Sequence, residues 1–274
     1  MKNDTDMYML IAGYRILVVF EKTQSPLLNF FRKNLIRSVS YYYKGFITEN
    51  EKMKVDFTLT VTEKHKPRLV QIEKPYVQNR VFLDLARQKR NNLFLNYHVS
   101  YFQFGHLLQF ALKRLLMRNG GIFHASSCLI NGCVYVFFAP SGGGKSTIIR
   151  LLQSRAFVNT FSDEFIILKQ NRKDVVAYQT PLIEKYKKRK SVHGVKVKAC
   201  FFLKKSPATV TCKRIKPDVI IPSLMPQSYF DQSGIMQQMR FLRKLAEYVP
   251  FHTLSFSKKR TYVKNLYASI TQLY

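Results

Sequence analysis

The residues with the clearest capacity for chemistry are a run of glycines that ends in a lysine and a hydroxyl, "APSGGGKS" at positions 139–146. The run fits the nucleotide-binding pattern G-x-x-x-x-G-K-[ST] at every position except the first, where Ala139 replaces glycine. Glycines allow backbone N–H groups to turn inward around phosphate oxygens, and a helix that begins near Lys145 adds the positive end of its dipole. The sequence therefore predicts a phosphate-binding P-loop formed by Ser141, Gly142, Gly143, Gly144, Lys145, Ser146 and Thr147.

The last residues of this loop have separate expected roles. Lys145 is expected to reach the β- and γ-phosphates of a nucleotide, and Ser146 is expected to coordinate Mg²⁺. ATP and Mg²⁺ are therefore the cofactors that the sequence predicts.

Phosphoryl transfer also needs an acid, and the chain supplies two adjacent ones in "NTFSDEFIIL". Asp163 follows Lys145 by eighteen positions, which leaves room for one helix and a return strand that would bring Asp163 and Glu164 beside the loop. We expect Asp163 to accept a proton from a hydroxyl nucleophile, and Glu164 to hold the metal directly or through water. His124, in "FHASS", is the third catalytic candidate with Asp163 and Lys145, although a packed histidine explains this position equally well.

These residues must be positioned by a sheet. Residues 130–133 contain an Asn-Gly pair between two apolar, β-rich runs, which predicts an antiparallel hairpin with a type I′ turn directly before the loop. Apolar residues at helical spacing predict one helix over residues 104–121 and another that starts near Lys145. We expect an α/β fold in which a mixed sheet carries the loop and helices flank it.

The part of the chain before residue 102 gives no catalytic signal. In residues 7–20 and in "VDFTLTVTE", apolar and polar residues alternate enough to predict strands, and "LLNFFRKNLI" is compatible with a short helix. The acids are scattered, and no metal-ligand spacing occurs. We therefore predict a β-rich N-terminal region at 1–101 and a P-loop catalytic domain at 102–274.

The charge of the chain is strongly positive. Its 274 residues include 45 Lys and Arg against 16 Asp and Glu, a formal charge of +29, which attracts nucleic acid, anionic lipid or acidic partners. Residues 169–216 contain fifteen Lys or Arg and two acids, most densely in "EKYKKRK" at 184–190. This segment is either a solvated loop or a docking site for an acidic protein, a peptide or nucleic acid.

Composition also narrows the cellular setting. No window reaches ~18 uninterrupted apolar residues, so no transmembrane helix is predicted, and the apolar stretch near the N-terminus lacks a small-residue cleavage site. The cytoplasm is therefore the expected location. The cysteines form no CxxC pair and are expected to be reduced core residues rather than zinc ligands: Cys128, Cys133, Cys200 and Cys212.

The stretch "GGIFHASSCLINGCVYVFFAPSGGGKSTIIRLL", followed by "FSDE", resembles the catalytic domain of the HPr kinase/phosphorylase family. His124, the P-loop and the acid pair match that family in order and approximate spacing. The segments "AYQTPLI", "VKVKACFFLKKS" and "LRKLAEYVPFHTLSF" are similar to its extended HPr-kinase-like relatives, some of which occur in peptide-modification systems. The resemblance covers roughly residues 104–274. It implies a fold of the phosphoenolpyruvate carboxykinase-like type, Asp163 as the base that activates a serine hydroxyl, and Glu164 in place of a second aspartate.

The leading prediction is an ATP-dependent kinase that transfers the γ-phosphate to a hydroxyl of a protein or peptide, a serine if the resemblance holds. The basic segment could dock an acidic substrate or supply a further phosphate contact. A small-molecule kinase of the shikimate or gluconate type also places an aspartate about one helix after its loop, although that loop usually opens the chain. A non-catalytic nucleotide-binding protein that contacts nucleic acid or an acidic partner is the other alternative, and the charge supports it. The acceptor, the nucleotide preference, a reverse phosphorylase reaction and assembly into a homo-oligomer are left open.

Overall fold

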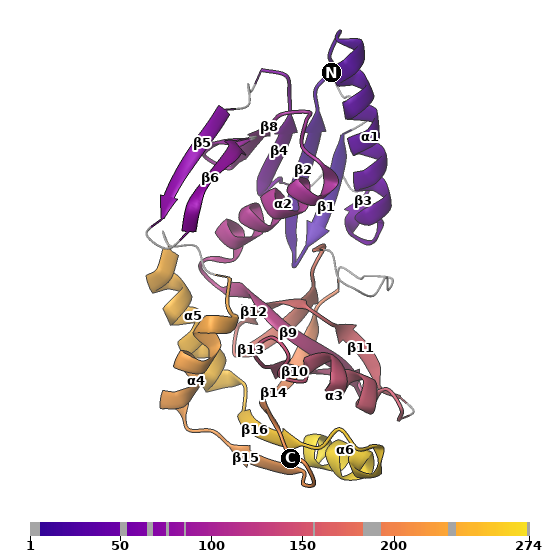
Figure 1. Ribbon diagram of the computed structural model, residues 1–274, viewed down its shortest axis with the longest axis vertical. Helices are drawn as coiled ribbons and strands as arrows, with labels where there is room; N and C mark the ends of the chain where they lie inside the picture. Colours follow the sequence, from indigo (N-terminus) through magenta and orange to yellow (C-terminus); the bar gives the residue numbers. More distant parts are fainter. Residues whose placement is uncertain are drawn as a thin grey trace. The chain divides into compact units, whose positions relative to one another are not determined.

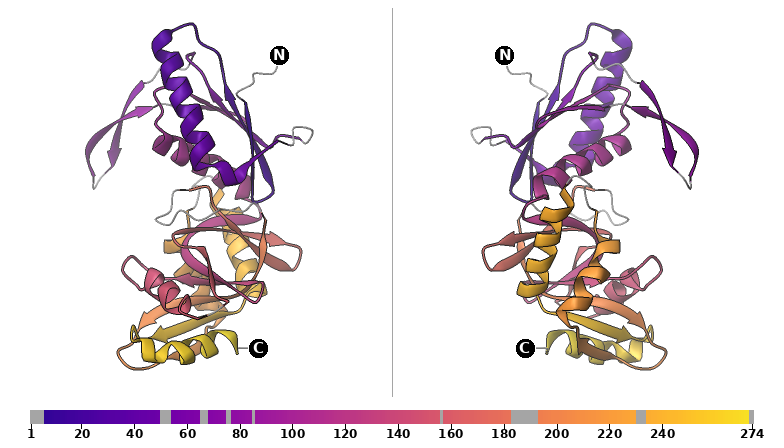
Figure 2. Two further views of the ribbon diagram at one scale, coloured as in Figure 1. Left: turned by 90° about the vertical axis from the view of Figure 1, so that its right-hand side faces the viewer. Right: turned by 90° about the vertical axis from the view of Figure 1, so that its left-hand side faces the viewer.

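The computed structural model describes residues 6–49, 54–64, 68–74, 77–84, 86–155, 157–182, 193–229 and 234–272. The chain divides into two compact units, Met1–Leu115 and Leu116–Tyr274, and each has its own sheet and helices (Figure 1; Figure 2). The protein is therefore a mixed α/β chain, as predicted. The division falls at residue 115, whereas the sequence pattern put it at residue 101.

The first unit is built on a six-stranded sheet with the order β3-β1-β2-β4-β8-β7. Residues 7–20 have the alternating apolar and polar pattern of a strand, but they form two strands. The chain turns at Ala12 and Gly13, which both have positive φ (50° and 79°). A separate antiparallel pair is formed by β5 and β6. The strands are β1 (Met7–Ile11), β2 (Tyr14–Phe20), β3 (Ile47–Thr48), β4 (Phe57–Val61), β5 (Arg68–Lys74), β6 (Val77–Asp84), β7 (Ala86–Lys89) and β8 (Asn92–Leu95).

Helix α1 (Pro26–Tyr42) is longer than the short helix that the sequence predicts, at 17 residues. Ser25 is its N-cap and accepts a hydrogen bond from the Leu28 N–H (3.4 Å), and a proline follows at the first helical position, where its missing N–H costs nothing. The helix buries Leu35 and Val39 and is followed by the short 3₁₀ helix η1 (Lys44–Phe46).

Helix α2 (Tyr101–Leu116) belongs to the first unit through its packing. The ring of buried Phe104 meets the ring of buried Tyr43, which directly follows α1, edge to face at 5.6 Å. The helix ends at Leu116 rather than at Gly121 because Gly120 opens the next strand, where a Cβ would lie 2.8 Å from a backbone oxygen.

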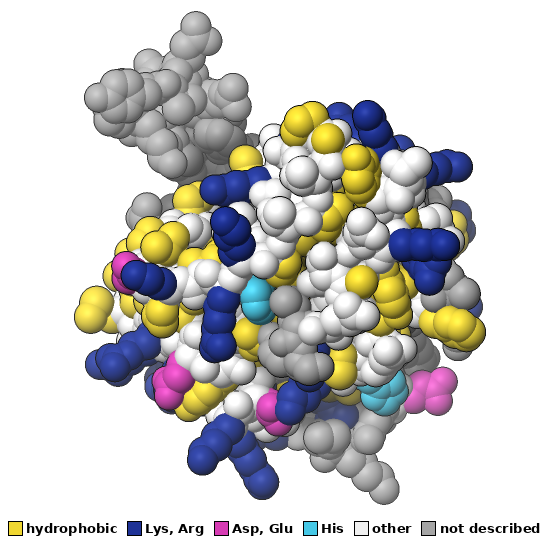
Figure 3. Space-filling view, turned by 90° about the horizontal axis from the view of Figure 1, so that it is seen from below, with side chains coloured by type: hydrophobic (Ala, Val, Ile, Leu, Met, Phe, Trp, Pro, Cys, Tyr) yellow, Lys and Arg dark blue, Asp and Glu magenta, His cyan; other side chains and the backbone are white. Residues whose placement is uncertain are grey.

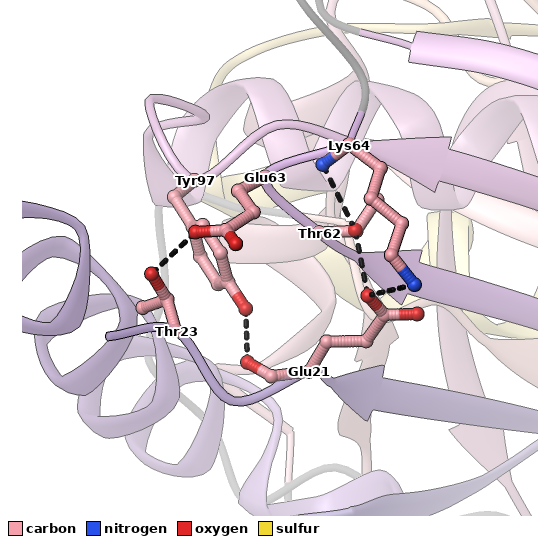
Figure 4. A network of polar contacts seen from close by, with 6 residues as sticks. All are labelled: Glu21, Thr23, Thr62, Glu63, Lys64 and Tyr97. Atoms are coloured by element: carbon pink, nitrogen blue, oxygen red, sulfur yellow. Dashed lines mark hydrogen bonds and ion pairs between the residues drawn. The ribbon is translucent and has the colours of Figure 1, made fainter. Parts of the chain in front are cut away.

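A polar network ties the ends of β2 and β4 to the segment after β8 (Figure 4). The Tyr97 hydroxyl donates to the Glu21 carbonyl oxygen, and the Thr62 hydroxyl donates to the Glu21 carboxylate (2.7 Å). The Lys64 ammonium lies 3.6 Å from that carboxylate. Burial, with a smaller contribution from the carboxylates of Glu21 and Glu63, raises the pKa of Tyr97 from 10.0 to about 12.

The second unit contains an eight-stranded sheet with the order β10-β9-β12-β13-β14-β16-β15, to which β11 adds by pairing with β9. The predicted hairpin before the glycine-rich loop is confirmed, because β9 and β10 are antiparallel and Asn131 and Gly132 both have positive φ (48° and 75°). The strands are β9 (Gly120–Ile130), β10 (Cys133–Phe138), β11 (Asn159–Ser162), β12 (Phe165–Asn171), β13 (Asp174–Gln179), β14 (Val195–Lys205), β15 (Thr211–Arg214) and β16 (Phe251–Phe256).

Five of these strands run in the same direction: β10, β11, β12, β14 and β16. Strands β10, β14 and β16 pair in parallel, in that order. Strands β11 and β10 are both antiparallel to β9, so they are parallel to each other on either side of it. The carboxyl ends of β11, β10, β14 and β16 therefore lie along one edge, which we call the carboxyl edge of the second unit.

Helices cover both faces of this sheet, with α4 and α5 on one side and α3 on the other in Figure 1. The side chains of β10 alternate between the two cores: Phe138 packs with Phe241 of α5, and Phe137 packs with Ile148 of α3 and Leu266 of α6. The helices are α3 (Lys145–Leu152), α4 (Pro217–Leu224), α5 (Ile235–Tyr248) and α6 (Val263–Thr271), with the short 3₁₀ helices η2 (Met225–Gln227) and η4 (Arg260–Tyr262).

The cysteines are all free, as expected for core residues. Cys128 and Cys200 are buried, and burial raises the pKa of both thiols; Cys133 and Cys212 are half-buried. Within the described ranges, no helix has the length and apolar character needed to cross a membrane.

Replacing Tyr97 by phenylalanine removes its hydroxyl and keeps its ring. We expect the free energy of unfolding at pH 7 to fall by about 1 kcal/mol, because the Glu21 carbonyl loses its donor. The pKa of Tyr97 is raised in the folded state, so the hydroxyl's stabilisation is fully present below pH 10 and is lost as the pH rises towards 12. The Tyr97→Phe variant should therefore lose less stability over that pH range, which urea denaturation followed by circular dichroism measures.

Tyr42→Phe is the matched control, because the Tyr42 ring stacks on Tyr101 and phenylalanine keeps that contact. The control should change the free energy of unfolding by less than about 0.5 kcal/mol. Equal losses in the two variants would contradict the role given to the Tyr97 hydroxyl.

Candidate functional site

One cavity of about 370 Å³ in the second unit collects every site residue that the sequence singled out. It adds two lysines that the sequence did not single out. The lining residues are His124, Ser141, Gly142, Gly143, Gly144, Lys145, Ser146, Thr147, Asp163, Glu164, Lys205 and Lys258. Their chemical roles stay predictions.

The glycine-rich loop, residues 139–146, has two positions where a side chain would strain the backbone and one where it would collide with the loop itself. Gly142 and Gly144 have positive φ (71° and 104°), which strains any residue with a Cβ. At Gly143 a Cβ would lie 2.6 Å from the Ala139 Cβ, so alanine at the first position fits because Gly143 has no side chain. At Gly144 a Cβ would lie 2.9 Å from the ring of Phe256, on which the loop rests.

Lys145 is buried at the first position of α3, with its ammonium folded back onto the loop. Its Nζ donates to the carbonyl oxygens of Ala139 (2.6 Å) and Pro140 (3.3 Å). The N-cap of α3 is Gly144, which has no side chain to cap the first-turn N–H groups. These groups and the ammonium surround a concave site that suits a multiply charged anion.

The acid pair follows β11 and is anchored to β9 through its backbone. The Ser126 hydroxyl donates to the Asp163 carbonyl oxygen, and the Ala125 N–H donates to that of Glu164 (3.2 Å). Asp163 is buried, with 6% of its surface exposed, and Glu164 is half-buried. The predicted helix and return strand between Lys145 and Asp163 are confirmed as α3 and β11.

His124 lies on β9 between the acid pair and the loop. It pairs across the sheet with Phe165, directly after the acids. With its amide oriented as the donor, Gln227 bridges the carbonyl oxygens of His124 (3.3 Å) and Ala139 (3.1 Å), so the backbone of His124 is tied to the start of the loop. His124 lines the cavity, as a residue that contacts a ligand must.

The groups follow the strand order along the carboxyl edge. The acids come after β11, His124 lies on β9, the loop follows β10, Lys205 ends β14 and Lys258 lies just past β16. Neighbouring strands are about 4.8 Å apart. The carboxylates of the acid pair therefore lie on one side of the loop, and the ammonium groups of Lys205 and Lys258 lie on the other.

No group of three or more His, Cys, Asp or Glu in the described part of the chain is placed to hold a metal ion by itself. A divalent cation at this site would need oxygens from a bound anion in addition to protein ligands. Ser146 and Glu164, both in the cavity, have the hydroxyl and carboxylate that such a shared site uses.

The protein is strongly basic on the face that Figure 3 shows. The face in Figure 3 carries many Lys and Arg side chains and few Asp or Glu, in line with the formal charge of +29. Such a field raises the local concentration of anionic ligands. The densest part of the basic segment 169–216, residues 184–190, lies outside the described residues.

Sequence reasoning missed Lys205 and Lys258. Lys205 is one of fifteen Lys or Arg in the basic segment, and Lys258 is one of three consecutive basic residues at 258–260, so nothing in the sequence distinguishes either from its neighbours. The register of β10, β14 and β16 brings them to the cavity, and single-sequence patterns do not reveal which strands pair.

No family model matches this chain, and no curated protein matches it. Among solved structures it has a distant similarity to the Hpr(Ser) kinase/phosphatase from Coxiella burnetii, with a TM-score of 0.31 and 14% sequence identity over 53% of this chain and 94% of that chain. A similarity at this TM-score does not define a shared fold.

The glycine-rich loop should bind inorganic tripolyphosphate, and Gly143→Ala should weaken that binding at least about tenfold. The added methyl group would force the loop away from Ala139 and Pro140 and widen the anion site. Isothermal titration calorimetry with tripolyphosphate measures the dissociation constant.

Gly132→Ala is the control, because it also replaces a turn glycine by alanine, at a positive φ (75°), but lies in the β9–β10 turn with open space around it. It imposes backbone strain without touching the cavity, so the affinity should stay at the wild-type value. A loss in both variants would show that general destabilisation explains the effect.

Proposed function

We propose that the second unit is an ATP-dependent kinase domain, of the phosphoenolpyruvate carboxykinase-like type that the sequence resembles. It transfers the γ-phosphate to a hydroxyl, by that resemblance a serine, of a protein or peptide. The observation that supports this most is the cavity that holds the glycine-rich loop, Lys145 and a buried carboxylate together. The cytoplasm supplies ATP and fits this activity.

ATP is the substrate that the loop would hold. The backbone N–H groups at the start of α3 would face its phosphates, whereas the Gly143 N–H donates to the Pro140 carbonyl oxygen (2.9 Å). The Lys145 ammonium would leave its carbonyl partners to meet the phosphates. Ser146 and Glu164 would hold Mg²⁺, which neutralises phosphate charge when bound.

Asp163 is the proposed general base. The acceptor oxygen forms a bond to the γ-phosphorus while the bond from that phosphorus to the β–γ bridging oxygen breaks. The hydroxyl proton passes to Asp163, and ADP leaves with the electron pair of the broken bond. His124, on the strand between base and loop, is suited to hydrogen-bond the transferring phosphate or the base.

A nucleotide-dependent binding protein is the second candidate, which the large positive charge favours. It does not account for Asp163. A carboxylate that is nearly buried beside an anion-binding loop loses hydration and repels the anionic ligand. Both effects cost free energy, and in a protein that only binds the nucleotide nothing would offset that cost. A kinase for a protein or peptide uses both the acid and the basic surroundings, which suit an acidic acceptor.

The test is labelling by γ-labelled ATP with Mg²⁺ in a cell extract, with wild-type protein and Asp163→Asn. We expect wild type to label a discrete protein or peptide and Asp163→Asn to label it at least about 100-fold more slowly, because the proton has no acceptor. Asp163→Asn should still bind ATP, since the loop is unchanged. Asp174→Asn removes an exposed carboxylate on β13 that pairs with Lys196 and should label at the wild-type rate.

Two results would contradict the proposal. Wild type that binds ATP but labels no protein, peptide or small molecule would favour the binding function. Labelling by Asp163→Asn at the wild-type rate would remove the base from the mechanism.

A further inference from the structure

Lys205 and Lys258 line the cavity, and the function proposed above gives neither of them a role. Both side chains are exposed, and neither ammonium has a hydrogen bond or ion pair with any residue that the structure describes. Asp163 and Glu164, in the same cavity, lie on the other side of the loop. Two cations without a protein counter-charge at an anion-binding loop indicate a ligand that supplies the charge.

The register of β14 brings Lys205 level with the loop. Phe202 pairs with Phe138, the last residue of β10, and Lys205 lies three residues further on, about 10 Å at the usual rise of a strand. At that level β10 has already become the loop. Alternation along β14 puts Lys205 on the same face as Leu203, which packs with Ile148 of α3, so Lys205 leaves the sheet on the side where α3 begins.

Lys258 is held beside the loop by the end of β16. Phe256 ends that strand, and its ring supports Gly144. The next residue, Ser257, is buried, and its hydroxyl donates to the Pro207 carbonyl oxygen (3.0 Å). The backbone on the N-terminal side of Lys258 is therefore fixed, while the side chain stays free to reach the cavity.

The order of strands indicates which part of a nucleotide these lysines meet. The proposed base follows β11 on one side of the loop, so the phosphate that is attacked lies towards that side. Lys205 and Lys258 follow β14 and β16 on the other side. The remaining phosphates of the nucleotide extend away from the base, towards the lysines.

We propose that Lys205 and Lys258 form a second anion subsite, which binds the α- and β-phosphates of the nucleotide. The subsite rests on the proposed function, because the position of the γ-phosphate is taken from the role of Asp163. It separates the cavity into an acidic side for the attacked phosphate and a basic side for the diphosphate that leaves. Negative charge grows on that diphosphate as the bond breaks, so the lysines also favour its departure.

The test is ADP binding by isothermal titration calorimetry, which needs no acceptor. Lys205→Gln and Lys258→Gln should each weaken ADP binding about fivefold, and the double variant should weaken it more than about tenfold. These factors are what the loss of a partly solvated ion pair with a phosphate would cause. Lys204→Gln and Lys259→Gln are matched controls, because both lysines are exposed neighbours that do not line the cavity. They should bind ADP like wild type, and Lys205→Arg should retain most of the affinity. AMP, which lacks the β-phosphate, should lose less affinity than ADP in the double variant.

The outcomes separate this subsite from the proposed function. Equal ADP affinity in the cavity variants and the controls overturns the subsite and leaves the kinase proposal standing. Wild type that does not bind ADP overturns both. Cavity variants that bind ADP normally but need more of the labelled acceptor for half-maximal rate would assign the lysines to an anion on the acceptor, which also overturns the subsite. Melting temperatures equal to those of the controls exclude misfolding as the cause of any loss.

Discussion

The common direction of β11, β10, β14 and β16 is the constraint on which the site depends. Parallel strands need crossover connections, and these return the chain so that every strand ends at the same edge. Here the short crossover through α3 brings the acid pair back beside the loop. The longer crossover through α5 leads into β16, whose Phe256 contacts the loop at Gly144. Groups from four separated segments therefore meet without any special arrangement of side chains, as in other open α/β sheets.

The cores on both faces of the sheet make this edge rigid. Phe138 contacts three other aromatic rings on the α5 side, those of Phe123, Phe202 and Phe251, with centroids 5.6 to 6.4 Å apart. On the α3 side, Phe137 stacks with Phe201 at 5.4 Å. The large buried rings at the end of β10 fix where the strand stops and the loop begins, so hydrophobic packing determines the position of the phosphate site.

The predictions from the sequence were accurate where the signal was local. The Asn131-Gly132 turn, the helix start at Lys145 and the strand before Asp163 each depend on a few neighbouring residues. Contacts between residues far apart in the sequence could not be predicted in this way. The apolar pattern of α2 indicates a helix, but it does not show that Phe104 packs on Tyr43. Because of that contact, α2 belongs to the first unit and the boundary lies at residue 115 rather than 101. The two cavity lysines are brought there by strand register, which patterns along one sequence do not contain.

The contact between Gly144 and Phe256 has a consequence for how the protein is made. The ribosome completes the glycine-rich loop and β10 long before it reaches β14 and β16, so a nascent chain holds β10 with one edge unpaired and the loop without its aromatic support. Such an edge is a template for wrong pairing, and β10 itself is apolar on both faces. The vectorial order of translation therefore delays assembly of the anion site until the last strand of the sheet emerges, and it gives molecular chaperones an interval in which to shield β10.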